Sequence, residues 1–219
     1  MKYYPVFMNV KDKSCLVVGG GSVGLRKAAM LQKCGANVRV VSESFAKGSD
    51  EIPTNIVLEK KKYTPTDIRN AFFIFAATNN ANVNQQVKRD AQQHEILCNI
   101  ADAPESSDFI LPSVVDRGDL VIAVSTSGKS PAMTRNIRQV LETMFGKEYE
   151  DVLVLLGNIR KKLRMENKTP PIKGIFAALM RRNILEKIRI KDAQKINAML
   201  NEVLGKDYTY KELMSTKKP

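Results

Sequence analysis

The sequence has no tryptophan, one histidine (His94) and only three cysteines among its 219 residues. Cys15, Cys34 and Cys98 are odd in number and far apart, so they fit neither a disulfide framework nor the paired spacing of a zinc site. The histidine stands in a polar stretch, AQQHEIL, and we expect it to lie exposed at the surface. The composition therefore predicts reduced thiols in a cytoplasmic compartment and no preassembled transition-metal site.

Long apolar runs are also missing, since none approaches the roughly 20 residues that a membrane-spanning helix needs. The first residues, MKYYPVFMNVKDK, lack an apolar core followed by a small-residue cleavage site, so no secretory signal is expected. Hydrophobic residues make up 43% and charged residues 26% of the chain. These shares are typical of a globular protein and exclude a disordered or fibrous class.

Charge is the one abnormal property, because 35 Lys and Arg stand against 23 Asp and Glu, for a formal net charge of +12. Most of the excess lies after residue 150. A basic chain predicts an acidic partner, which is a nucleic acid, a membrane surface or a small anion. The basic tail has Tyr208 and Tyr210 but no alternation of aromatic and basic residues, which argues against nucleic acid.

The first hundred residues alternate between short β-branched runs and helical patterns. Strands are predicted at residues 15–19, 37–41, 55–59, 71–77 and 95–100, and helices at residues 22–34 and 82–93. Alternation at this spacing predicts an α/β fold with a mostly parallel sheet and helices on both faces.

The pattern changes after residue 102. Two further strands are predicted at residues 109–115 and 119–125, then a helix at residues 131–145 that begins with Ser130 as cap and Pro131 in its first turn. Beyond residue 149 only helices are predicted, at residues 151–165, 172–188 and 192–204. The last third is thus expected to be a separate, basic, all-helical part.

The strongest chemical motif is GGGSVG at residues 19–24, between the first strand and the first helix. Gly19 allows the tight turn, Gly21 lets the backbone approach a pyrophosphate, and Gly24 lets the helix pack closely on the strand. The helix N-terminus then offers N–H groups to the phosphates. The motif indicates a dinucleotide site, and a turn chosen only for packing is the alternative.

An acidic residue at the end of the second strand usually binds the ribose of NAD. Glu43 lies 19 residues beyond Gly24, which is a compatible spacing. The alternative is that Glu43 is an exposed acidic residue of a loop with no role in binding. No Lys or Arg stands immediately there to bind the 2′-phosphate of NADP, and Lys47 is the nearest. The local sequence therefore favours NAD over NADP.

Several motifs in order carry a family resemblance: YYPVFMNVKDKSCLVVGGGSVGLRKAAML, FAATNNANVNQQV and CNIADAPESSDFILPSVVDRGDLVIAVSTSGKSPAMTR. Together with the basic helical tail, they make the chain resemble the precorrin-2 dehydrogenase family, the dehydrogenase and ferrochelatase module of siroheme synthesis. The close match covers roughly residues 3–145, and the tail matches in character more than in detail. One departure is Gly24, where the family usually has Ala, and a dinucleotide turn accepts both.

The resemblance implies a homodimeric enzyme that oxidises precorrin-2, a tetrapyrrole with eight carboxylates, to sirohydrochlorin with NAD. In some members insertion of ferrous iron into sirohydrochlorin follows in the same site. It also implies a Rossmann domain at residues 1–112, a dimerisation region at residues 113–148 and a helical domain at residues 149–219.

For the site, the resemblance implies that Asp102 is the general acid or base. Around the nucleotide it places the glycine turn and further residues, which are Ser22, Val23, Glu43, Ser44, Ala76, Ala77 and Thr78.

The residues support part of this independently. Asp102 follows the fifth predicted strand and so belongs at the carboxyl edge of the sheet, where open α/β folds bind ligands. The alternative is a loop aspartate that bonds its own backbone near Pro104. Asn99 either contacts substrate or satisfies backbone groups at the strand edge. Ser127 and Ser130 either bind a substrate carboxylate or only cap the following helix.

A polycarboxylate substrate also accounts for the basic tail, whose candidate contacts are Arg160, Lys161, Lys162, Arg164, Arg181 and Arg182. Some of them are expected to form a solvated helix face. The alternative function is an NAD-sensing regulatory module without catalysis. Such a module shares the glycine turn, but it predicts neither the CNIADAP and SGKSP segments nor the basic tail.

Overall fold

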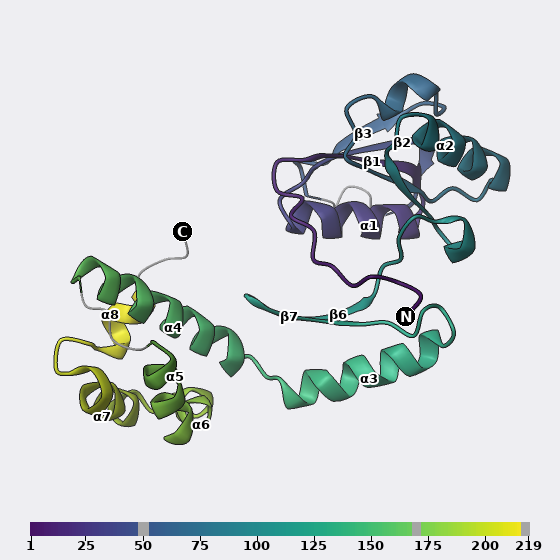
Figure 1. The fold of residues 1–219 in the computed structure, drawn as a ribbon. Helices are drawn as coiled ribbons and strands as arrows, with labels where there is room; N and C mark the ends of the chain where they lie inside the picture. Colours follow the sequence, from purple (N-terminus) through teal and green to yellow (C-terminus); the bar gives the residue numbers. More distant parts are fainter. Residues whose placement is uncertain (48–52, 168–171, 216–219) are drawn as a thin grey trace. The chain divides into compact units, whose positions relative to one another are not determined.

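The computed structural model describes residues 1–47, 53–167 and 172–215. The chain divides into two compact units, residues 1–111 and residues 112–219, which are described separately below. Figure 1 shows the order of helices and strands along the chain.

The first unit is built on one five-stranded sheet in which every pair of neighbours is parallel. The strand order is β3-β2-β1-β4-β5, so the chain moves outward from the central β1 in both directions. This is the order of dinucleotide-binding folds, and it confirms the predicted α/β architecture. The strands are β1 (Ser14–Gly20), β2 (Asn37–Phe45), β3 (Val57–Lys60), β4 (Phe73–Ala76) and β5 (Leu97–Ile100).

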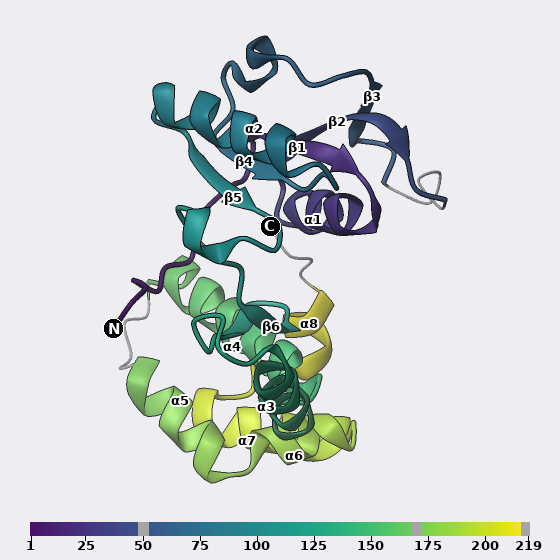
Figure 2. The ribbon, with the colours of Figure 1, turned by 90° about the vertical axis from the view of Figure 1, so that its right-hand side faces the viewer.

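Helices α1 (Ser22–Lys33) and α2 (Ala81–Gln93) cover opposite faces of this sheet (Figure 2). Alternate residues of β1 enter two different cores, because successive side chains of a strand point to opposite faces. Val17 packs with Leu25 and Ala28 of α1, whereas Leu16 and Val18 join the core of Val87 and Ala91 from α2. Burial on both faces explains why β1 is an uninterrupted apolar run. The described residues of this unit also form the 3₁₀ turns η2 (Pro65–Ile68) and η3 (Pro104–Ser106).

The second unit begins with the antiparallel pair β6 (Ser113–Arg117) and β7 (Leu120–Val124) and the helix α3 (Pro131–Met144). The described residues that follow form the helices α4 (Glu148–Met165), α5 (Ile172–Arg181), α6 (Ile184–Arg189), α7 (Ala193–Leu204) and α8 (Tyr210–Ser215). Their apolar faces meet in one core that includes Leu155, Leu179, Ile196 and the buried Tyr208. The predicted helical character of the last third is confirmed.

The structure corrects several predicted boundaries. The strand predicted at residues 109–115 begins only at Ser113, after Pro112, which has no N–H to donate to a ladder. The helix predicted at residues 172–188 is two helices, because Asn183 adopts a left-handed backbone with φ of +56°. β2 continues to Phe45, so Glu43 and Ser44 lie inside the strand. The three-part division at residues 112 and 148 stays a prediction.

The glycine turn packs so closely that side chains have no room at Gly19, Gly20 and Gly24. A Cβ on Gly19 would lie 2.3 Å from the carbonyl oxygen of Ala77, and the φ of Gly19 is +120°. A Cβ on Gly24 would lie 2.1 Å from the carbonyl oxygen of Gly19. The contacts hold β1, α1 and the segment after β4 together at the carboxyl edge of the sheet.

We predict that Gly19→Ala destabilises the first unit by about 2 kcal/mol or more, because it combines a backbone clash with a positive φ. Chemical denaturation followed by circular dichroism measures the loss. Gly21→Ala is the matched control, since a Cβ there meets nothing within 4 Å and φ is −73°. Equal stability of the Gly19→Ala protein and the control would contradict the packing argument.

Candidate functional site

The N-terminus of α1 is an uncapped helix end that faces open space. Gly21 is the N-cap residue; no side chain caps the helix, and its first turn contains no acidic residue. The first N–H groups and the positive end of the helix dipole are thus left for an anion. Of the candidates in this turn, Gly24 is buried, Val23 is half-buried and Ser22 is exposed.

The end of β2 lies against the glycine turn. A Cβ on Gly20 would be 2.5 Å from the carbonyl oxygen of Ser44, so the two backbones touch. Ser42 supports this end, because its Oγ donates to the Ser44 carbonyl oxygen at 2.7 Å. The Glu43 side chain is exposed, and its Oε1 lies 3.9 Å from Nζ of Lys62. The structure therefore brings Glu43 and Ser44 to the turn, together with Lys62, which is distant from residue 43 in sequence.

The segment after β4 forms the other side of the turn. Ala76 and Ala77 are buried, and the Ala77 carbonyl is the group that Gly19 contacts. Thr78 is fixed by Asn84 of α2, whose Oδ1 accepts from the Thr78 backbone N–H at 3.1 Å and from its Oγ1 at 2.7 Å. Sequence reasoning missed Asn84, although it stands in the quoted segment FAATNNANVNQQV.

Asp102 lies in the loop that follows β5, beside the residues after β4. The N–H of Ala101 donates to the carbonyl oxygen of Ala76 at 2.8 Å. Asp102 is exposed and its φ is +62°, a left-handed conformation that aspartate and asparagine tolerate better than other side chains. Among the described residues its carboxylate makes no hydrogen bond or ion pair, so nothing in them supports the alternative of a carboxylate bonded to its own loop.

Other side chains hold this loop along the free edge of β5. The Oδ2 of Asp108 accepts from the Cys98 N–H at 2.8 Å, and the Oγ of Ser107 accepts from the Ile100 N–H at 2.9 Å. Asp108 also forms an ion pair with the buried Lys88 of α2. Asp102 is thus exposed while the base of its loop is fixed.

A cation that the sequence analysis did not single out lies near the same loop. Lys27 of α1 donates from Nζ to Oδ1 of Asn99 at 3.2 Å and lies over the ring of Phe75. Asn99 is buried, and its Nδ2 donates to the Phe109 carbonyl oxygen at 2.8 Å. Burial lowers the pKa of Lys27, the neighbouring Arg26 lowers it further, and the charge of Asp102 opposes both. Asn99 therefore has a structural role, because it connects Lys27 to the backbone at Phe109.

Ser127 and Ser130 belong to the second unit. Ser130 caps α3, since its Oγ accepts from the N–H of Met133 at 3.2 Å. Ser127 has a left-handed backbone with φ of +55° in the turn before that helix. The capping role predicted for Ser130 is therefore present, and a role in substrate binding stays a prediction for both residues.

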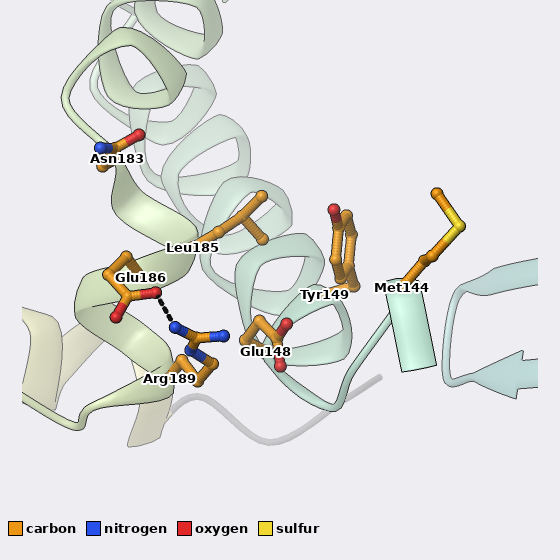
Figure 3. A pocket seen from close by; sticks show the side chains of 7 residues that line it. All are labelled: Met144, Glu148, Tyr149, Asn183, Leu185, Glu186 and Arg189. Atoms are coloured by element: carbon orange, nitrogen blue, oxygen red, sulfur yellow. Dashed lines mark ion pairs between the residues drawn. The ribbon is translucent and has the colours of Figure 1, made fainter. Parts of the chain in front are cut away.

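Hollows lie at two places among the described residues of the second unit. One, of about 510 Å³, is lined by charged and apolar side chains, and Arg189 forms an ion pair with Glu186 at its wall (Figure 3). The other, of about 400 Å³, has mostly apolar walls from α4 and α5, and two charged side chains also line it, Arg160 and, from the turn between β6 and β7, Asp119.

The remaining basic candidates divide into two groups. Lys162 binds Glu212 at 2.8 Å, and Arg182 binds Glu202 at 3.1 Å, so both serve contacts within the helical part. Lys161, Arg164 and Arg181 lie exposed.

Within residues 1–47, 53–167 and 172–215, no three His, Cys, Asp or Glu side chains are grouped so that they could hold a metal ion. His94 is exposed, as predicted, and its Nδ1 lies 2.9 Å from the Asp90 carbonyl oxygen. Cys15 and Cys98 are buried free thiols, and burial raises the pKa of Cys98 to about 11. No helix in the described part of the chain is both long and apolar enough to cross a membrane.

Two family models match the chain. A model described as "Putative NAD(P)-binding" matches residues 6–113, and one described as "Sirohaem biosynthesis protein central" matches residues 117–144. The first covers the parallel sheet with its glycine turn and the Asp102 loop. The second covers β7 and α3 and reaches only the last residue of β6, Arg117.

Similar proteins include siroheme synthases. The chain is 34% identical over 212 residues to the siroheme synthase of Vesicomyosocius okutanii, which covers 93% of this chain and 45% of that protein. It is 36% identical over 166 residues to the siroheme synthase of Nitrosococcus oceani, covering 75% of this chain and 36% of the relative. The chain thus spans less than half the length of these relatives.

A solved structure described as "SirC, precorrin-2 dehydrogenase" is similar with a TM-score of 0.73 and 26% identity. That likeness covers 94% of this chain and all of the SirC chain.

We predict that Gly21→Asp abolishes binding of NAD while the protein stays folded. The open space in front of Gly21 would receive a carboxylate, which repels phosphate and occupies its place. Isothermal titration with NAD measures the loss, and Gly21→Ala tests the effect of bulk without charge. Unchanged NAD affinity of the Gly21→Asp protein would exclude the turn as the pyrophosphate site.

Proposed function

Because this chain belongs to the family of precorrin-2 dehydrogenases and of the matching part of siroheme synthases, we propose that it oxidises precorrin-2 to sirohydrochlorin with NAD. One observation carries the proposal. The Ala101 N–H donates to the Ala76 carbonyl oxygen, which places the exposed Asp102 carboxylate beside the same sheet edge as the glycine turn.

The residues at this edge fit a dinucleotide. The uncapped N-terminus of α1 and the open space at Gly21 suit a pyrophosphate, and Ser22 and Val23 begin that helix. In our proposal Glu43 and Ser44 hold the ribose, and Ala76, Ala77 and Thr78 lie toward the nicotinamide. When bound, NAD supplies a hydride acceptor.

Asp102 then has the task of a general base. Oxidation of precorrin-2 removes a hydride and a proton, and we assign the proton to a carboxylate oxygen of Asp102. A carboxylate that makes no bond within the described protein is available for this transfer. The ion pair of Lys88 with Asp108 and the bond of Asn99 to Phe109 position the loop without consuming Asp102.

The second unit offers contacts for a polycarboxylate substrate. Arg160 lines a hollow with mostly apolar walls, which suits a macrocycle with acidic side chains. The exposed Lys161, Arg164 and Arg181 are further candidates, as are Ser127 and Ser130 in the turn before α3. Lys162 and Arg182 are weaker candidates because acidic partners within the helical part already hold them.

Insertion of ferrous iron into the product is a separate question. Iron would enter as substrate, and the described residues contain no prebuilt group of metal ligands. The macrocycle nitrogens and Asp102 would then have to hold the metal. The assay below therefore measures oxidation and iron insertion separately.

A homodimer is part of the proposal. Met133, Ile137, Val140 and Met144 follow each other at spacings of four, three and four residues on α3, and between 37% and 61% of each residue is exposed. Such a stripe is the seam along which helices of two chains pack. We also propose a cytoplasmic location, which suits the free cysteines.

The deciding assay is anaerobic incubation of the purified chain with precorrin-2 and NAD, followed by ferrous iron. NADH formation and the later change in macrocycle absorption report the two reactions independently. An NAD-sensing module would bind NAD and produce no NADH, which would overturn the dehydrogenase assignment.

We predict that Asp102→Asn lowers the rate of NADH formation by at least about a hundredfold, the usual effect of a general base. Asparagine is the suitable replacement because it tolerates the left-handed backbone and removes only the charge. NAD affinity, measured by titration, should stay within about twofold. Normal turnover of this variant would remove Asp102 from the mechanism.

We predict that Val140→Glu converts the dimer to a monomer at micromolar concentration, since burying the charge at a helix seam weakens association by roughly a hundredfold. Light scattering after size-exclusion chromatography gives the mass. Gln139→Glu is the matched control, because it adds the same charge on the same helix away from the stripe. A dimeric Val140→Glu protein would show that this face is not the interface.

A further inference from the structure

The three lysines at residues 60–62 lie beside the end of β2. Ser42 pairs with Lys60 in the sheet register, and the Lys61 N–H donates to the Ser42 carbonyl oxygen at 3.0 Å. β2 and β3 run side by side, and Figure 2 shows their adjacent ends. Sheet pairing therefore delivers basic side chains to the place where Glu43 stands, although they are distant in sequence.

Lys61 is already engaged. Its Nζ lies 2.6 Å from Oδ1 of the buried Asp67 and 3.2 Å from Oε2 of Glu59. The hydrogen bond to Asp67 raises the pKa of Lys61, and Arg39 binds the same two carboxylates. This network fixes the end of β3 and pairs Lys61 with two carboxylates of the protein.

Lys62 differs from Lys61 in its surroundings. Its side chain is 83% exposed, and Nζ lies 3.9 Å from Oε1 of Glu43, which is 67% exposed. An exposed pair at this distance contributes little to stability, so Lys62 can turn to another anion at small cost. Lys62 therefore pairs with Glu43 at the position where we expect the ribose to bind.

We propose that Glu43 and Lys62 together decide between NAD and NADP, and that the chain contains a 2′-phosphate subsite that Glu43 keeps closed. This inference rests on the proposed dinucleotide site. Glu43 accepts hydrogen bonds from the ribose hydroxyls of NAD and repels the 2′-phosphate of NADP. Without the charge of Glu43, Lys62 binds that phosphate.

Isothermal titration with NAD and NADP tests the proposal without substrate. Glu43→Gln should raise the NADP affinity by about tenfold and lower the NAD affinity several-fold, since it removes one repulsion and weakens the ribose contact. Lys62→Met added to Glu43→Gln should abolish the gain in NADP affinity. The gain should also shrink as salt rises, because the new contact is an exposed ion pair.

Lys13→Met in the Glu43→Gln background is the matched control. It removes the same charge from the residue before β1, at the opposite edge of the sheet, and should keep the NADP gain. Unchanged NADP affinity of Glu43→Gln, or a gain that survives Lys62→Met, overturns this inference while NAD binding by the unmodified chain stands. If the unmodified chain does not bind NAD, the proposed function fails as well.

Discussion

The missing side chain at Gly19 is the constraint on which the rest of the first unit depends. Because the Gly19 backbone touches the Ala77 carbonyl, β1 can turn into α1 while the segment after β4 stays against the turn. The close approach of Gly24 to Gly19 then sets the start of α1. Three separate stretches of sequence thereby share one edge of the sheet, and Asp102 joins them through the bond of Ala101 to Ala76.

Charge is distributed differently in the two units. Around the glycine turn the groups open to a ligand are backbone N–H groups and single side chains such as Glu43. The surplus of basic residues belongs to the helical part. Several of those basic residues bind acidic partners within that part, as Lys162 and Arg182 do. Net charge alone therefore overstates how many cations are available to a polyanionic ligand.

The sequence was sufficient to predict the parallel sheet, since β1 is an apolar run and a glycine turn between a strand and a helix is typical of a parallel α/β unit. It was also sufficient to place Asp102 at the carboxyl edge. It was insufficient for Lys27 and Lys62, because their partners, Asn99 and Glu43, become neighbours only through sheet and helix packing. The break in the helix at Asn183 was missed because asparagine adopts the left-handed conformation without a local signal.

The loop that carries Asp102 has a second role. β5 is an edge strand, and Asp108 and Ser107 satisfy the N–H groups of Cys98 and Ile100 that an edge strand presents to solvent. Such unpaired groups recruit strands from other chains and start aggregation. Substitutions of Asp108 or Ser107 would therefore expose these N–H groups and lower solubility, independently of the role proposed for Asp102.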